Sequence, residues 1–521
     1  MFRKEYFLLI VCFLLLFLNL TAQQSLIPLN FETQINYEKN LLREEQLTFT
    51  AIRPLLKSNI QVYFNVDSIH YLYGRDQKII AKLKHPKWWQ KIRTEDLIRI
   101  KESDFILRVN PLINFSSGKT EYNSTESDLS FNTRGVSISG DLGTKFSFGS
   151  GVYERQASFP RYYTDFIKER RVVPGQGRAR VFQETGFDYS QAFGYLSFTP
   201  TKVFNFQIGH GKHFIGEGYR SLILSDNSYN MPYVKFTTTW KWIRYTNLLM
   251  AYQNSKIADG TSEISNRRYG SVTSIDFLVA NFMEIGLTES IVWQKKKLDA
   301  YLPEFNYYNP FILYRTFQYG MNAKNNILLG LNTKIKISKS ILTYAQFVFD
   351  DSKKNAYQVG VKWYDMFRLP FFMQLEYNMV QPYTYSHWDK QSYTHYNQEL
   401  AHPLGANFSE FIGRWKYSWK DVILSYQVNY AQVGQDSNKV NFGSDILTIN
   451  DECVGHNLYQ GVKTNIVNQS FTLAYLINPS VNLQAYFRYR IRRTENEFGI
   501  SLESFYLFGL KTNIQNLYDD F

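Results

Sequence analysis

The sequence predicts an all-β fold, a transmembrane antiparallel β-barrel of about eighteen strands. Three observations predict it. The chain begins like an exported protein, yet no later stretch approaches the ~18–20 uninterrupted apolar residues of a membrane-spanning helix. Aromatic residues make up 17% of the chain. Segments of about ten residues alternate apolar and polar side chains, as membrane strands do. Because only a closed barrel satisfies backbone hydrogen bonds in lipid without helices, these observations favour strands in a membrane.

The N-terminus has the three parts of a secretory signal peptide. Arg3 and Lys4 supply positive charge, residues 7–18 form an apolar core, and Ala22 offers a small residue at a cleavage point. We therefore expect residues 1–22 to be a signal peptide, with a retained membrane anchor as the alternative. Its removal leaves one cysteine, Cys453, so no disulfide can form within the mature chain.

The next segment, residues 23–102, differs from the rest in its pattern. Apolar residues Ile35, Leu41, Leu42 and Leu47 recur at helical spacing between good helix formers. We expect a small, partly helical periplasmic segment attached to the barrel. An additional strand pair at residues 60–74 is the alternative.

The barrel itself is expected over residues 103–521. In residues 422–432, bulky apolar side chains occupy alternate positions, and Ser, Gln and Asn fall between them. A soluble sandwich also alternates. The two faces decide between the classes, because large aromatic residues suit lipid whereas charged residues suit a wet lumen. The polar faces carry Lys362, Glu376, Arg488 and Arg490.

Eighteen strands are predicted, an even number as in bacterial single-chain barrels, and a count of sixteen stays open. Their ranges are 103–115, 128–139, 143–155, 191–199, 203–209, 233–240, 243–253, 269–281, 284–295, 327–337, 340–350, 355–366, 371–381, 408–419, 421–433, 461–475, 480–492 and 501–514. Short turns and long loops join them, and the long loops are expected at the outer face.

One long loop, residues 156–190, concentrates basic and aromatic side chains in a chain whose formal net charge is +12. Cations and aromatic rings together suit acidic glycans and lipopolysaccharide phosphates. An exported loop rarely meets nucleic acid, so no nucleic-acid partner is expected. A solvated loop that neutralises the membrane surface is the alternative. The candidate glycan-contacting residues are Arg161, Tyr162, Tyr163, Lys168, Arg170, Arg171, Arg178 and Arg180.

Residues 209–232 form a glycine-rich polar segment between two predicted strands. Spacing would let His210, His213 and Glu217 bind a metal on a helix, but four glycines within residues 209–218 argue against a helix. No metal, cofactor or catalytic residue is therefore expected here. We expect the segment to fold into the lumen, where buried polar groups need partners. The predicted lumenal polar network comprises His210, Lys212, His213, Glu217, Arg220, Asp226 and Asn227.

The run "GHGKHFIGEGYRSL" (209–222), continuing through Ser225-Asp226-Asn227, resembles the signature of RemB-type gliding-motility outer-membrane proteins, which are related to the Wzi-type capsule-assembly family. The runs "FTAIRPLL" (49–56), "NPFILYR" (309–315) and "HPLGANFSEF" (402–411) extend the resemblance over nearly the whole mature chain. Wzi-type proteins are expected to have an aromatic-Gly-Pro-Gly turn where this chain has Ile215-Gly216-Glu217-Gly218, which favours the motility branch. The resemblance implies an eighteen-stranded barrel occluded at its periplasmic side and working at the cell surface.

We compare three classes of function for this chain. The favoured one is a non-enzymatic outer-membrane protein whose long loops contact surface polysaccharide, adhesins or secretion machinery, with outer-membrane lipid and lipopolysaccharide around it. The alternative is a passive channel or transporter for solutes, because eighteen strands enclose a wide lumen. An outer-membrane enzyme is disfavoured, since no Ser-His-Asp constellation stands out.

Overall fold

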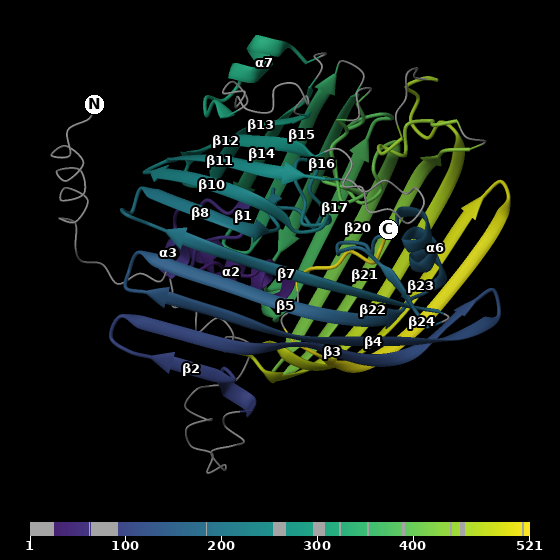
Figure 1. Ribbon diagram of the computed structural model, residues 1–521, viewed down its shortest axis with the longest axis horizontal. Helices are drawn as coiled ribbons and strands as arrows, with labels where there is room; N and C mark the ends of the chain where they lie inside the picture. The colour runs from purple at the N-terminus through teal and green to yellow at the C-terminus, as the bar shows by residue number, and fades with distance from the viewer. Residues whose placement is uncertain are drawn as a thin grey trace.

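A computed structural model describes residues 25–61, 63, 92–183, 185–253, 267–294, 308–321, 325–351, 354–387, 391–437, 440–448, 454–512 and 515–521. The signal peptide expected at 1–22 and most of the alternative strand pair at 60–74 lie outside these residues. Within this part of the chain, eighteen long strands form a closed antiparallel barrel (Figure 1).

Each barrel strand overlaps one of the eighteen predicted ranges, although the ends of several are shifted, so the predicted fold class and strand number are confirmed. They are β3 (Phe105–Tyr122), β4 (Thr125–Leu142), β5 (Phe146–Ser158), β7 (Gly186–Phe198), β8 (Phe204–Gly211), β10 (Met231–Trp240), β11 (Ile243–Tyr252), β12 (Arg268–Ala280), β13 (Met283–Gln294), β14 (Asn326–Lys336), β15 (Ile341–Asp351), β16 (Lys354–Trp363), β17 (Phe371–Val380), β20 (Phe408–Trp419), β21 (Val422–Gln435), β22 (Val462–Asn478), β23 (Leu483–Asn496) and β24 (Gly499–Lys511).

Each barrel strand pairs with the next one along the wall, and the last strand closes on the first. Tyr506 of β24 lies opposite Lys119 of β3. Two short strands add to the edges of this ring: β2 (Ile98–Lys101) pairs with β3, and β6 (Arg180–Phe182) pairs with β7. Closure leaves the barrel without the exposed sheet edge that lipid would not tolerate.

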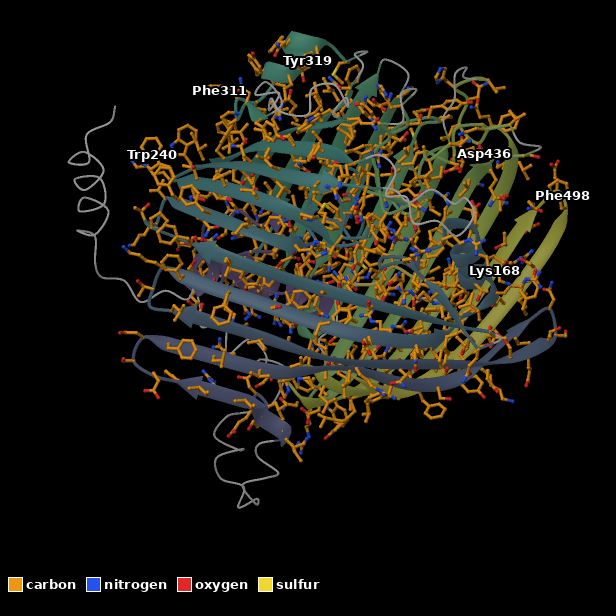
Figure 2. All side chains as sticks on the ribbon, in the orientation of Figure 1. Lys168, Trp240, Phe311, Tyr319, Asp436 and Phe498 are labelled. Atoms are coloured by element: carbon orange, nitrogen blue, oxygen red, sulfur yellow. The ribbon has the colours of Figure 1, made fainter. Side chains whose placement is uncertain are left out.

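Side chains alternate between the outer wall and the lumen as the sequence pattern predicts. On β23, Phe487 is 40% exposed on the outer wall, whereas neighbouring Arg490 is 4% exposed and faces inward. Trp240, Trp242 and Trp419 remain exposed beside short turns (Figure 2 labels Trp240). Aromatic side chains at strand ends are typical of the interfacial girdles of membrane barrels.

The two ends of the barrel differ. One end has short connections such as residues 241–242, 281–282 and 420–421, and we call it the short-turn end. The other carries longer connections, including residues 159–185 and 381–407, and we call it the long-loop end. Among the described helices, none combines the length and apolar character needed to cross a membrane.

Residues 25–61 lie inside the short-turn end of the barrel. Asn30 caps helix α2 (Phe31–Arg43), and β1 (Ile52–Arg53) and α3 (Lys57–Gln61) follow. Lys362 of the wall donates to Glu38 of α2 at 2.6 Å, and Lys39 pairs with Asp365 at 2.6 Å. The predicted helical character of the N-terminal segment is confirmed, while the compartment that this end faces stays a prediction.

Three further segments turn into the lumen. Residues 212–230, between β8 and β10, contain the short strand β9 (Phe214–Ile215). Residues 381–407 contain the hairpin of β18 (Thr394–His395) and β19 (Gln398–Glu399). The C-terminal residues 515–521 return from β24 towards helix α6 (Arg161–Arg170), so the C-terminus lies within the outline of the barrel (Figure 1). We call these three segments, together with residues 25–61, the plug.

Outside the plug, helix α7 (Tyr314–Tyr319) and the single turn η4 (Met366–Arg368) lie in connections between strands. The largest apolar core joins plug residues to wall residues. Leu222 and Leu224 of the plug belong to the same buried cluster as Leu248 and Val272 of the wall. The plug is therefore packed against the barrel rather than suspended in it.

Candidate functional site

The centre of the lumen is built from sequence runs that are far apart in the chain. Strand β1, from the run at 49–56, pairs with β9, from the run at 209–222. Arg53 donates to the carbonyl of Gly216 at 2.9 Å and lies 4.2 Å from the centre of the Phe214 ring. Gly216 has φ of 130°, a conformation that residues with a side chain rarely adopt. The β1–β9 pairing and the hydrogen bond from Arg53 to Gly216 join two segments of the plug, residues 25–61 and residues 212–230.

Arg220 is the centre of the charge network. Its guanidinium donates twice to Glu410, at 2.9 and 3.2 Å, and lies 3.1 Å from Asp520 of the C-terminal tail. Arg220 is 0% exposed and Glu410 is 1% exposed. Glu410 also contacts His402 at 2.7 Å. A buried bidentate pair is both strong and orientation-specific, so it sets where this segment of the plug lies.

The wall also holds the plug backbone. The main-chain N–H groups of Tyr219 and Arg220 donate to the Glu376 carboxylate, at 2.7 and 3.1 Å. Gly218 lies so close to Glu376 that a Cβ there would be 2.7 Å from a carboxylate oxygen. The glycines of this run therefore permit the plug to approach the wall.

Three further residues of the predicted network, Glu217, Asp226 and Asn227, are also buried in the lumen. Glu217 accepts from Lys334 of the wall at 3.1 Å and from Thr50 at 2.6 Å. Asp226 accepts from Tyr518 of the C-terminal tail at 2.6 Å. The Asn227 main chain donates to Ser225 at 3.2 Å.

Lys212 enters the plug beside these residues. Its ammonium donates to the carbonyls of Gly175 and Asp226, at 2.6 and 2.9 Å. Burial lowers the pKa of Lys212 to about 8, against the opposing effect of Asp226. The lysine therefore joins the loop at 159–185 to the plug.

The two predicted histidines are placed apart from the Arg220 pairs. His213 is buried, and its ring lies 4.3 Å from that of Tyr233 in a perpendicular arrangement. Burial holds its pKa well below the usual value, so His213 is neutral at physiological pH. His210 lies on β8, with its ring 6.0 Å from Tyr229. Neither arrangement brings the two histidines together with Glu217 as one ligand set.

The candidate glycan-contacting residues divide into exposed and internal side chains. Tyr163 is buried and stacks on Phe159 at 4.6 Å. Tyr162 donates to the main chain of Asp519 at 2.6 Å. Arg170 pairs with Asp445 at 3.1 Å and lies 3.7 Å from Glu399. The exposed members, which we call the rim cations, are Arg161, Lys168, Arg171, Arg178 and Arg180; Figure 2 labels Lys168.

Sequence reasoning missed the C-terminal tail. Asp519 accepts from Arg488 and Arg490 at 2.9 and 2.8 Å, and Phe521 packs against Tyr162 and Tyr163. The available signal was the acidic pair Asp519-Asp520 near the C-terminus, together with the arginines at inward positions of β23, the strand before β24. Opposite charges of that kind favour contact once the tail turns inward.

A cavity of about 300 Å³ lies between the tail, α2, the start of α6 and the barrel wall. Its charged lining residues are Glu32, Arg155, Arg414, Lys416, Arg488, Arg490, Lys511 and Asp519. Aromatic rings complete it, among them Phe159, Tyr162 and Tyr189. Small-molecule sites have volumes of roughly 300–1,000 Å³, so this one is at the small end of that range.

Neither a protein-family model nor a curated protein sequence matches this chain. Among solved structures, the chain is similar to Wzi, an outer-membrane protein involved in group 1 capsule assembly in Escherichia coli and a carbohydrate-binding β-barrel. The TM-score is 0.54 at 12% identity, over 95% of this chain and 100% of Wzi. OccK9 (OpdG) of Pseudomonas aeruginosa aligns with a TM-score of 0.43 at 9% identity, over 78% of this chain and 98% of that one. The likeness to Wzi shows that the fold is that of an outer-membrane β-barrel.

Proposed function

We propose that this chain is a non-enzymatic protein of the outer membrane that contacts acidic surface polysaccharide through the long-loop end of its barrel. Export by a signal peptide at residues 1–22 would deliver it there. Outer-membrane lipid and lipopolysaccharide would surround the apolar outer wall. Wzi, which is similar in fold, is a carbohydrate-binding barrel involved in capsule assembly.

The observation that carries the proposal is the combination of a filled lumen with an exposed basic loop. Plug segments from the N-terminus, the C-terminus and the long loops meet at Arg220 and around it. A barrel filled in this way supports contact at its surface rather than passage through its centre. The rim cations then offer the charge that acidic glycans would meet first.

Arginine suits this role because its planar guanidinium forms paired hydrogen bonds with carboxylate and phosphate groups. Arg171 and Arg178 are exposed on the same loop, and Arg180 is exposed on β6. Arg171 has φ of 61° and ends helix α6, which directs the chain away from the helix axis. Arg170 pairs with Glu399 of the plug, and Lys212 of the plug donates to the carbonyl of Gly175 in the loop. These contacts hold the loop in place, and with it the exposed cations.

The resemblance to RemB-type proteins adds a role in gliding motility to the proposal, with adhesins or secretion machinery as protein partners. Most of the run on which the resemblance rests, residues 212–222, is buried in the plug. It would act on such partners indirectly, by holding the loops that reach the surface.

Retention on a polygalacturonate column tests the proposed contact. We expect the combined change of Arg171→Gln, Arg178→Gln and Arg180→Gln to elute the detergent-solubilised protein at clearly lower salt, because exposed ionic contacts are screened by salt. The control exchanges Lys119, Arg134 and Arg493, exposed cations of the barrel strands, for Gln. Heat-modifiable migration on gels reports that each variant is folded. Elution of the rim variant at the wild-type salt concentration would refute contact by these residues.

A further inference from the structure

The lumenal cavity of about 300 Å³ carries an excess of positive charge. Six of its charged lining residues are Arg or Lys, and two are acidic. Asp519 pairs with Arg488 and Arg490, and Glu32 lies 4.0 Å from Lys511. In these ion pairs the two carboxylates pair with three of the six cations, Arg488, Arg490 and Lys511.

Arg155 is a lining cation outside these pairs. It projects inward from β5, is 3% exposed, and its guanidinium lies over the Tyr153 ring at 4.3 Å and 5.9 Å from that of Tyr189. Its Nε and Nη2 atoms have no hydrogen-bond acceptor in the described part of the chain. A buried guanidinium is costly unless an anion or acceptors compensate it, so Arg155 indicates an anionic ligand.

Arg414 adds a second cation that is held by rings. It lies 4.3 Å from the Tyr219 ring and 4.8 Å from the Phe31 ring, and it donates to Gln374 at 3.0 Å. Its charge is therefore directed into the cavity without a carboxylate among the described ion pairs.

The rest of the lining suits a hydroxylated ligand. Amide and hydroxyl side chains line the cavity beside the aromatic rings, and they include Asn114, Thr133, Gln176, Gln427 and Thr472. A sugar presents hydroxyl groups to such donors and acceptors, and an apolar ring face to aromatic side chains. Phe159 and Tyr162, at the start of the loop that carries the rim cations, form part of the wall.

We propose that this cavity binds one acidic sugar residue, with the Arg155 guanidinium taking the anionic group and the aromatic wall taking the sugar ring. The proposal deepens the proposed function, since the ligand class is the same, but the site is separate from the rim. The loop at 159–185 connects the two sites.

Calorimetric titration of the full chain in detergent with glucuronate, glucose and inorganic phosphate tests this site. We expect saturable binding of glucuronate, with glucose at least tenfold weaker. Arg155→Gln should weaken glucuronate binding at least tenfold, because a hydrogen-bonded charge pair is lost. Arg134→Gln is the matched control, since Arg134 lies on the adjacent strand and is exposed on the outer wall. Its affinity should equal that of the wild type.

A stability measurement separates a ligand site from a structural role. Without ligand, Arg155→Gln should melt no lower than the wild type, because a buried cation without a counterion is removed. Wild-type protein that does not bind glucuronate, equal affinity for glucose, equal affinity in Arg155→Gln, or binding of phosphate alone would each overturn the proposal. The variant with Arg171→Gln, Arg178→Gln and Arg180→Gln should bind glucuronate as tightly as the wild type. If the cavity does not bind glucuronate, the column test of the rim cations therefore still stands.

Discussion

At the scale of single residues, the lumen depends on charges that are almost completely removed from water. Arg220 and Asp520 come from two segments of the plug, residues 212–230 and the tail at 515–521, and Glu410 comes from the wall. Burying each charge is unfavourable by several kcal/mol, and only their mutual attraction and hydrogen bonds offset it. Each of these three segments is therefore stable in its position only when the other two are also in place.

This dependence predicts a large effect of removing one partner. Arg220→Met should lower the free energy of unfolding by about 3–5 kcal/mol, because the buried carboxylates of Glu410 and Asp520 would lose the guanidinium that compensates them. Urea unfolding of protein folded into phospholipid vesicles measures the change. The control is Lys119→Met, since the Lys119–Glu126 pair is exposed and should contribute little. A loss for Arg220→Met no larger than for Lys119→Met would contradict this account.

The sequence allowed the plug residues to be named but not their partners. Lys212, Glu217, Arg220 and Asp226 are conspicuous because charged residues interrupt a glycine-rich run between strands. Their partners, such as Glu410 and Asp520, lie 190 and 300 positions away from Arg220. No local pattern encodes such distances, since they depend on how far each segment turns into the lumen.

At the scale of elements, helix α6 is held between the tail and the β18–β19 hairpin. Phe521 packs on Phe166 of α6 at 5.2 Å, and Arg170 reaches Glu399 of the hairpin. The Asn397 side chain donates to the Arg170 carbonyl at 3.0 Å. The loop that carries the rim cations is therefore attached to the plug at several points.

Glu399 should make this attachment depend on pH. Burial raises its pKa to about 7, although Arg170 opposes the shift, and Asp445 and Glu169 add to it. When the hairpin is packed against helix α6, Glu399 is protonated between pH 4.5, its ordinary pKa, and pH 7. When the hairpin is released to solvent, Glu399 is ionised over the same range. Docking is thus most favourable below this window and weakens as pH rises through it, by at most about 1.4 kcal/mol per pH unit.

Hydrogen exchange of residues 391–407 at pH 5 and pH 8, corrected for the intrinsic rates, checks this effect. The wild type should show weaker protection at pH 8, and Glu399→Gln should remove that difference. His395 and His402 lie in the same segment, so the comparison between wild type and variant isolates the contribution of Glu399. An unchanged pH dependence in Glu399→Gln would rule it out.

Element prediction from sequence succeeded where a period of two persists. Each barrel strand alternates because one side chain in two faces lipid, and this constraint holds along the whole wall. The hairpin of β18 and β19 has two residues in each strand, too few for a period to appear. Helix α2 was recognisable from its spacing, but its place inside the barrel depends on Glu38 and Lys362, which no local pattern connects.

At the scale of the whole molecule, the plug enters the barrel from both ends. Residues 25–61 and 515–521 enter at the short-turn end, where β24 ends, and residues 212–230 and 381–407 enter at the long-loop end. Segments from the two ends meet inside the barrel, as Tyr518 of residues 515–521 donates to Asp226 of residues 212–230. In the described part of the chain, segments that enter from opposite ends therefore contact one another inside the barrel.

A plugged barrel should not conduct ions. In planar bilayers, the unmodified chain should give no ohmic steps. Replacing residues 214–228 with a Gly-Ser linker and truncating after Thr512 should produce steps in the nanosiemens range, because both central segments are then removed. The control inserts a Gly-Ser segment, as long as the linker that replaces residues 214–228, at the exposed turn of residues 497–498. This control should give no ohmic steps. Steps from the unmodified chain would instead support a channel, and a folded but silent double variant would show that the remaining segments alone close the lumen.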